Sequence, residues 1–147
     1  MRIRKISKPS KGAVRNATKV EYNGIKFDSK LEQFTYKQLR LLKINFALKS
    51  KFVIFDSFRY HNELIRAITW QPDFILPEQN TILETKGFAN DQWSLKIKLI
   101  KKFFLNKVNF VYENQDGVSV EWTLNNPKLV ICKNQKEVNT YLASIIK

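Results

Sequence analysis

Cysteine and histidine are almost absent from this sequence of 147 residues, which contains one of each, Cys132 and His61. A single cysteine excludes a disulfide within the chain, and one Cys with one His excludes zinc sites built from these ligands. Long apolar runs are missing too. None approaches the roughly 18 residues of a membrane helix, and no apolar core follows the basic N-terminus as in a signal peptide. We therefore expect a protein of the reducing cytoplasm, with Cys132 as a core residue.

Acidic residues are also scarce. The chain has 13 Asp and Glu against 26 Lys and Arg, so its formal net charge is +13. This excess implies a polyanionic partner, with nucleic acid as the first expectation and an anionic membrane surface as the second. Hydrophobic residues make up 44% of the chain, which supplies a core and excludes disorder over its whole length. The length predicts one domain.

The first 19 residues concentrate positive charge. They contain Pro9 and Gly12, no acidic residue and no hydrophobic periodicity, so we predict a flexible basic arm over residues 1–19 and a single domain over residues 20–147. The arm is expected to bind nucleic-acid phosphates; the alternative is a solvated tail that only keeps the protein soluble. Its basic residues are Arg2, Arg4, Lys5, Lys8, Lys11, Arg15 and Lys19.

Local signals after the arm alternate between strand and helix. Asn23-Gly24 is a hairpin dipeptide within the apolar segment 20–27. Ser29 and Glu32 have capping-box spacing at the start of a helix that extends to about Lys43. We expect further strands over 46–55, 58–76 with a turn at His61-Asn62, 81–86, 108–112, 118–124 and 129–132, and helices over 92–106, capped by Asp91, and 135–146, capped by Asn134. These elements predict an α/β fold with a mixed β-sheet flanked by helices.

Two of the predicted strands carry the residues with the most chemistry. Pro72-Asp73 is followed by ten residues, including a turn at 77–80, and then by Glu84-Thr85-Lys86. On adjacent antiparallel strands Asp73 and Glu84 can lie close together, and Glu84 and Lys86 point to the same face. Carboxylates hold Mg²⁺, the metal lowers the pKa of an attacking water, and a lysine orients that water, so the group suits phosphodiester hydrolysis. We predict Asp73, Glu84 and the Thr85 carbonyl as metal ligands and Lys86 as the water-positioning group, with Mn²⁺ able to replace Mg²⁺.

This pattern resembles the PD-(D/E)xK nuclease superfamily over roughly residues 24–112. Residues 24–32 and Arg66-Ala67-Ile68-Thr69 are similar to small phage nucleases. The chain also looks like the endonuclease I type of Holliday-junction resolvase, which carries a glutamate on its first helix at the position of Glu32. The resemblance implies a restriction-endonuclease-like core, a catalytic or metal-holding role for Glu32, and a place in phage recombination or DNA processing in the bacterial or phage-infected host cytoplasm.

We therefore predict a Mg²⁺-dependent DNA endonuclease that cuts branched DNA. One site cuts one strand, so symmetric cleavage of a junction requires a homodimer. Lysines on the predicted helix 92–106 are expected to bind phosphates, with an ordinary solvated helix face as the alternative. They are Lys96, Lys98, Lys101 and Lys102.

Each site residue also has a structural interpretation. Asp73 after Pro72 fits a turn, and Glu84 with Lys86 fits the solvated face of an exposed strand. Glu32 fits a helix cap as well as it fits catalysis. For the whole protein, the alternatives are a non-catalytic DNA-binding phage structural protein and the cleavage subunit of a larger recombination or transposition complex.

Overall fold

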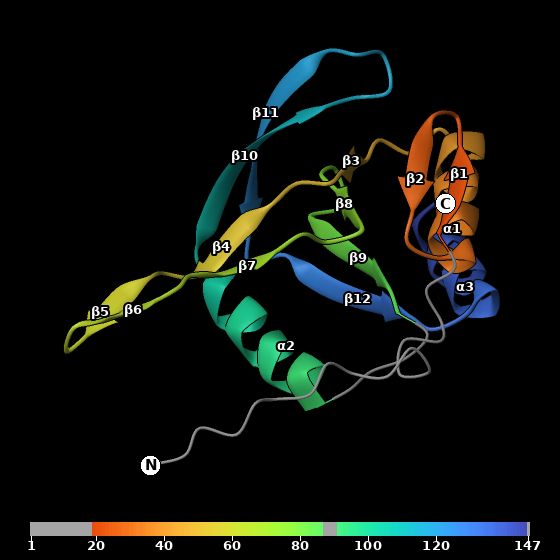
Figure 1. The fold of residues 1–147 in the computed structure, drawn as a ribbon. Coiled ribbons are helices and arrows are strands. Elements are labelled where there is room, and N and C mark those ends of the chain that lie inside the picture. Colours follow the sequence, from red (N-terminus) through yellow and green to blue (C-terminus); the bar gives the residue numbers. More distant parts are fainter. Residues whose placement is uncertain (1–18, 87–90, 147) are drawn as a thin grey trace.

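The structure, a computed structural model, describes residues 19–86 and 91–146. In these residues it is a mixed α/β fold with three helices and several small sheets (Figure 1). The predicted arm up to residue 18 lies outside the described residues. No helix in the described ranges is long and apolar enough to cross a membrane.

The central sheet has four strands, β3 (Ala47–Leu48), β8 (Phe74–Leu76), β9 (Thr81–Thr85) and β12 (Lys128–Cys132). Their order is β12-β9-β8-β3. β8 is antiparallel to both β9 and β3, whereas β12 is parallel to β9. Parallel neighbours need a long crossover connection, and here it contains a helix. The sheet is therefore mixed, as predicted.

Three helices cover the two faces of this sheet (Figure 1): α1 (Lys30–Leu41), α2 (Asp91–Phe103) and α3 (Gln135–Ile145). Successive strand residues point to opposite faces. Phe74 and Leu76 pack into one core cluster with residues of α1 and α3. Ile75, between them, packs into a second cluster with residues of α2. Cys132 is buried in the first cluster, which confirms it as a core residue.

The two predicted capping boxes are present and have the same geometry. In α1 the Ser29 hydroxyl accepts a hydrogen bond from the Glu32 N–H at 3.1 Å, and Glu32 Oε2 accepts one from the Asp28 N–H at 3.1 Å. In α3 Asn134 Oδ1 accepts from the Glu137 N–H at 2.9 Å, and Glu137 Oε2 accepts from the N–H of residue 133 at 2.6 Å. Each glutamate thus satisfies a backbone donor in front of its helix.

Two of the smaller sheets are antiparallel hairpins. The first pairs β1 (Val20–Tyr22) with β2 (Ile25–Phe27), and Asn23 and Gly24 between them have φ of 56° and 75°, the region that this dipeptide tolerates. The second pairs β10 (Lys107–Glu113) with β11 (Ser119–Asn125). The predicted hairpin over 20–27 is confirmed, and so are the strands predicted over 108–112 and 118–124.

The segments 46–55 and 58–76 form strands as predicted, but the structure divides them into six short strands. Lys49 has a φ of 56°, which ends the extended conformation directly after β3. Pro72 has no N–H to donate, and it separates the strand that ends at Trp70 from β8. The turn at His61-Asn62 is confirmed. The additional strands are β4 (Phe52–Phe55), β5 (Phe58–Tyr60), β6 (Glu63–Ile65) and β7 (Ile68–Trp70), with β4 paired to β7 and β5 paired to β6.

The predicted bounds of α2 also differ from the structure. Asp91 is the first helical residue instead of the cap, and residues 87–90 lie outside the described residues. The helix ends at Phe103, earlier than the predicted residue 106, because the Leu105 N–H bonds to the Lys102 carbonyl in a tighter turn. This turn directs the chain into β10.

Candidate active site

Asp73 and Glu84 meet at the open end of the β8–β9 hairpin, away from the turn at residues 77–80. The register pairs Phe74 with Leu83, so Asp73 and Glu84 are the next neighbours across the two strands. Thr85 donates two hydrogen bonds to Asp73 Oδ2, one from its N–H and one from its hydroxyl, each at 2.8 Å. The structure therefore brings the two predicted carboxylates together and fixes the orientation of Asp73.

The Glu84 side chain is buried at this position, with 8% of its surface exposed. Within the described part of the chain, its Oε2 atom has no hydrogen-bond partner. Burial first, and then the negative charge of Asp73, raise the pKa of Glu84 far above its ordinary value, against the opposing effect of Lys86. A buried carboxylate with an unsatisfied oxygen is costly unless a donor or a cation binds it.

Glu32 brings a third carboxylate to the same place from α1. It is also 8% exposed, and its cap bond to Asp28 uses Oε2. Burial and the charge of Asp73 raise the pKa of Glu32 from 4.5 to about 7. Since Asp73 raises the pKa of both Glu32 and Glu84, the three predicted acidic residues lie within electrostatic reach of one another. We call these three residues the carboxylate cluster.

Lys86 lies beside the carboxylate cluster, two residues after Glu84 and one residue beyond the end of β9. Its Nζ atom is 4.5 Å from the centre of the Trp93 ring on α2, a cation–π contact, and its N–H donates to the Cys132 carbonyl at 3.0 Å. Its charge lowers the pKa of Glu84. The contact with the Trp93 ring thus limits where the Lys86 ammonium, the predicted catalytic cation, can lie.

The carboxylate cluster suits a hard divalent cation. Its donors are all oxygens, which Mg²⁺ and Mn²⁺ prefer, and the orphaned Glu84 oxygen provides a free ligand atom. Over residues 19–86 and 91–146, no three His, Cys, Asp or Glu side chains are already close enough to enclose an ion. The hydroxyl and N–H of Thr85 are both used by Asp73, so its predicted role as a ligand rests on the carbonyl.

Sequence reasoning missed one basic residue at this site, Lys49. Its charge lowers the pKa of Glu32, so it lies within electrostatic reach of the carboxylate cluster. Lys49 stands after β3, whose residue Leu48 pairs with Phe74 next to Asp73. Nothing in the local sequence around Lys49 signals this position, because it follows from the pairing of distant strands.

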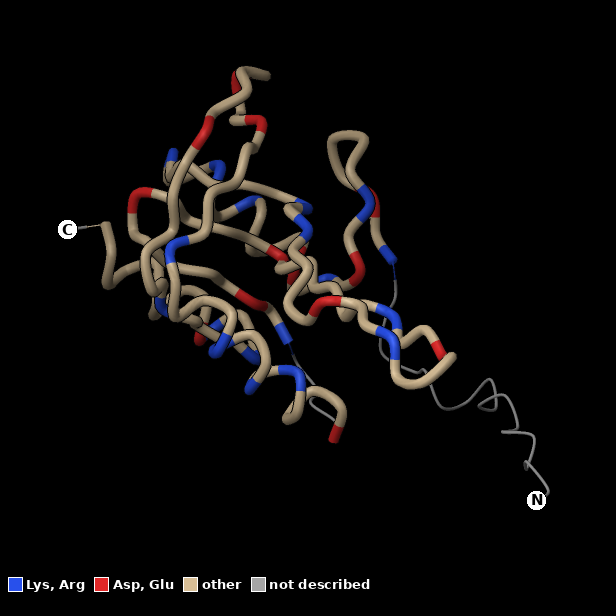
Figure 2. Tube along the Cα trace, turned by 90° about the vertical axis from the view of Figure 1, so that its left-hand side faces the viewer, with Lys and Arg blue, Asp and Glu red and all other residues tan. Residues whose placement is uncertain are grey.

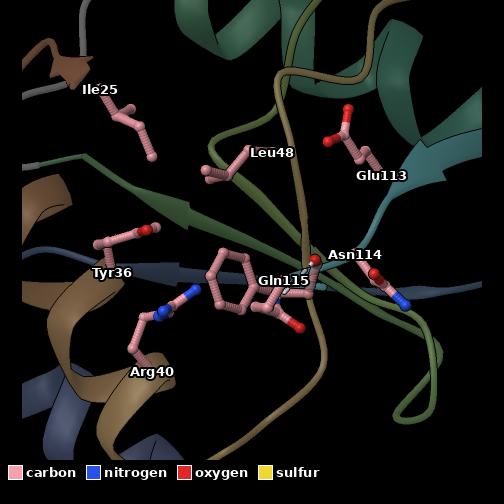
Figure 3. A pocket seen from close by; sticks show the side chains of 8 residues that line it. Ile25, Tyr36, Arg40, Leu48, Glu113, Asn114 and Gln115 are labelled. Carbon is pink, nitrogen blue, oxygen red and sulfur yellow. Dashed lines mark hydrogen bonds between the residues drawn. The ribbon is translucent and has the colours of Figure 1, made fainter. Parts of the chain in front are cut away.

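A cavity of about 360 Å³ lies between α1, β2 and the turn after β10, and no residue of the carboxylate cluster lines it (Figure 3). Tyr36, one helical turn beyond Glu32, forms part of its wall, and Leu48 forms another part. Arg40 contributes a cation, and Gln115 donates from Nε2 to the Phe46 carbonyl at 3.3 Å. The cavity therefore combines aromatic, aliphatic and hydrogen-bonding groups.

Figure 2 marks the basic positions along the Cα trace, which include the predicted phosphate-binding lysines of α2. Lys98, Lys101 and Lys102 are exposed, and Lys96 is half-buried. Lys19, the first described residue, is exposed as well. The other predicted contacts of the arm, Arg2, Arg4, Lys5, Lys8, Lys11 and Arg15, lie outside the described residues.

Comparisons with known proteins yield a family. The searches of curated proteins and of solved structures gave no match. Residues 13–129, most of the chain, match the family described as "Protein of unknown function (DUF1064)". The matched segment contains Glu32, Asp73, Glu84 and Lys86. The chain therefore belongs to the DUF1064 family.

Proposed function

We propose that this protein is a Mg²⁺-dependent DNA endonuclease with a restriction-endonuclease-like core. The observation that carries the proposal is the carboxylate cluster of a strongly basic protein, in which Glu32 and Glu84 are buried and Glu84 Oε2 has no hydrogen-bond partner among the described residues. The order of elements supports it: α1 with Glu32, the β8–β9 hairpin with Asp73 and Glu84, α2, and β12 parallel to β9. The resemblance to PD-(D/E)xK nucleases implies the same order.

The residues of the site have distinct roles in this proposal. Asp73, Glu84 and Glu32 would hold the ion, with the Thr85 carbonyl as a further ligand. When bound, the ion supplies a water of lowered pKa and stabilises charge on the phosphate. Lys86 orients that water or stabilises the developing charge, and the Trp93 contact limits where its ammonium can lie. The resemblance to PD-(D/E)xK nucleases implies products with a 5′-phosphate and a 3′-hydroxyl.

A non-catalytic DNA-binding protein is the first rival. Its net charge would be the same, but it gains nothing from burying Glu32 and Glu84 beside Asp73 where a polyanion must approach, because burial of unpaired charge costs free energy. A cleavage subunit of a larger complex is the second rival, and it would share the carboxylate cluster while cutting little DNA alone. Metal-dependent cleavage of DNA by the isolated chain is expected from the proposed endonuclease and from neither rival.

We further propose branched DNA as the substrate and a homodimer as the active form. Over the described residues no helix-turn-helix is evident, and Lys and Arg supply mainly sequence-independent phosphate contacts. Discrimination would then rest on DNA shape, and two sites related by a two-fold axis fit the symmetric strands of a four-way junction.

The experiment is incubation with linear, nicked, flapped and four-way DNA of matched sequence, in Mg²⁺ and in EDTA. We expect paired nicks in the junction, little cleavage of the linear duplex, and none in EDTA. Equal cleavage of linear and branched DNA would exclude the junction preference and leave the nuclease. No cleavage of any substrate would favour the binding protein or the subunit.

The chain offers a matched test of whether Glu32 is a metal ligand or only a helix cap. Glu32→Gln and Glu137→Gln remove the same charge from the same cap position of two helices, and each keeps an acceptor oxygen. We expect Glu32→Gln to weaken Mg²⁺ binding and slow cleavage by about 10-fold or more, and Glu137→Gln to change neither. Both should lose less than about 1 kcal/mol of stability. Wild-type cleavage by Glu32→Gln would leave Glu32 with its cap role alone.

A further inference from the structure

The β5–β6 hairpin projects from the body of the protein as a two-stranded ribbon (Figure 1). Six of the thirteen large hydrophobic residues that are exposed in the described part of the chain lie on or beside it, between residues 53 and 68. They are Val53, Phe55, Phe58, Tyr60, Leu64 and Ile68. An isolated two-stranded ribbon is marginally stable in water, and an apolar patch of this kind marks an interaction site.

The charge of the hairpin region argues against DNA as its partner. Residues 53–68 contain two acids, Asp56 and Glu63, and two bases, Arg59 and Arg66, so they carry no net charge in a protein of +13. A DNA-binding element is expected to be basic, because phosphate contacts supply most of the affinity. A neutral, aromatic-rich surface is instead typical of the centre of a protein interface.

A groove of about 740 Å³ lies at the root of the same hairpin. Phe55, Leu99, Phe103 and Val108 give it apolar walls, and its charged lining residues are Lys102, Lys107 and Asp56, so that positive charge exceeds negative charge by one. The hairpin tip carries Glu63 beside Tyr60 and Leu64, and Arg59 lies opposite Leu64, one residue further from the turn. The acid and the two apolar side chains of the tip suit the groove, but the tip and the groove lie at opposite ends of one hairpin.

We propose that two copies of this chain associate through a two-fold axis, with the hairpin of each copy seated in the groove of the other. An antiparallel arrangement of two hairpins brings each tip to the root of its partner, where the groove lies. In this arrangement Leu64 and Tyr60 contact the apolar walls, and Glu63 contacts Lys102 and Lys107 of the partner chain. The interface is self-complementary, as a closed dimer requires. It does not depend on nuclease activity.

The test measures self-association of the full chain without DNA, by sedimentation over a range of concentrations. We expect a concentration-dependent dimer. Glu63→Lys should raise the dissociation constant of the dimer by about 10-fold or more, because the positive charge at position 63 of each copy then repels Lys102 and Lys107 of the other copy. Combining it with Lys102→Glu and Lys107→Glu should restore the dimer, since this exchanges the charges of both partners.

A matched pair of variants checks the apolar contact. Leu64→Asp should dissociate the dimer, whereas Leu41→Asp, at an exposed leucine on α1, should leave it intact. Circular dichroism and the thermal midpoint show whether each variant is folded; if Leu64→Asp is not, the charge exchange alone decides. A wild-type monomer at the highest attainable concentration, or a dimer that survives Leu64→Asp and Glu63→Lys, would overturn the proposal. Loss of DNA affinity by Leu64→Asp with an unchanged dimer would assign the hairpin to DNA and overturn it as well.

Discussion

Asp73→Asn and Glu84→Gln should each reduce DNA cleavage by at least about 100-fold, the largest effect expected of any substitution in this protein. Both changes remove a negative ligand and leave a side chain of nearly the same shape. DNA binding should persist, because less negative charge remains near the phosphate. The measurement is single-turnover cleavage of the four-way junction in Mg²⁺, together with DNA affinity in EDTA.

Two controls make this result specific. Glu137→Gln removes a carboxylate from the cap of α3, outside the carboxylate cluster, and should cleave at the wild-type rate. The thermal midpoint of each variant in EDTA should be no lower than that of the wild type, because crowded carboxylates repel one another without metal. Wild-type cleavage by Asp73→Asn or Glu84→Gln would remove the proposed site.

Elements with a local chemical cause could be predicted from the sequence. Asn23-Gly24 indicates a hairpin because both residues tolerate positive φ, and Ser29 and Asn134 indicate helix starts because their side chains bond to N–H groups three residues later. The pairing of Asp73 with Glu84 follows from two strands joined by a short turn. The candidate site could therefore be predicted, because Asp73, Glu84 and Lys86 are close in sequence.

Elements fixed by distant contacts could not be predicted. Residues 46–76 are rich in Phe, Val, Ile and Tyr throughout, so the sequence gives no sign that β3 and β8 join the central sheet while β4 to β7 form separate ribbons. The charge of Lys49 acts on Glu32, and the Trp93 ring contacts the Lys86 ammonium, only because folding brings distant segments together. Composition identifies strand-forming residues but does not identify their partners.

The structure also changes the choice between two interpretations of Glu32. Glu137 shows that the cap needs only an acceptor oxygen on an exposed side chain. Glu32 makes the same bond but is buried beside Asp73, which raises its pKa to about 7. A cap alone does not require this burial. The cap and the metal site are therefore compatible roles, since the cap bond uses Oε2 and leaves Oε1 available to the cluster.

Metal-free protein should lose stability as the pH rises through the neutral range. Burial and Asp73 raise the pKa of Glu32 from 4.5 to about 7, and they raise that of Glu84 further. A group whose pKa is higher in the folded state binds more protons there than in the unfolded state. Its contribution is complete below about pH 4.5 and is lost as the pH passes the folded pKa. For Glu32 the loss lies between about pH 4.5 and 7, and Glu84 extends it to more alkaline pH.

Glu84→Gln isolates this effect from the other titrating groups, because the amide is neutral at every pH. In EDTA, its thermal midpoint minus that of the wild type should increase from pH 5 to pH 8. Mg²⁺ should reverse the order: at about 100 times its dissociation constant it stabilises the wild type by about 2.7 kcal/mol, or roughly 5 to 10 °C, and Glu84→Gln by much less. Thermal melts at several pH values, with Glu137→Gln as the control, measure both. If the midpoint difference is constant with pH and neither Mg²⁺ nor Mn²⁺ changes it, the carboxylate cluster neither destabilises the fold through charge repulsion nor binds a divalent cation.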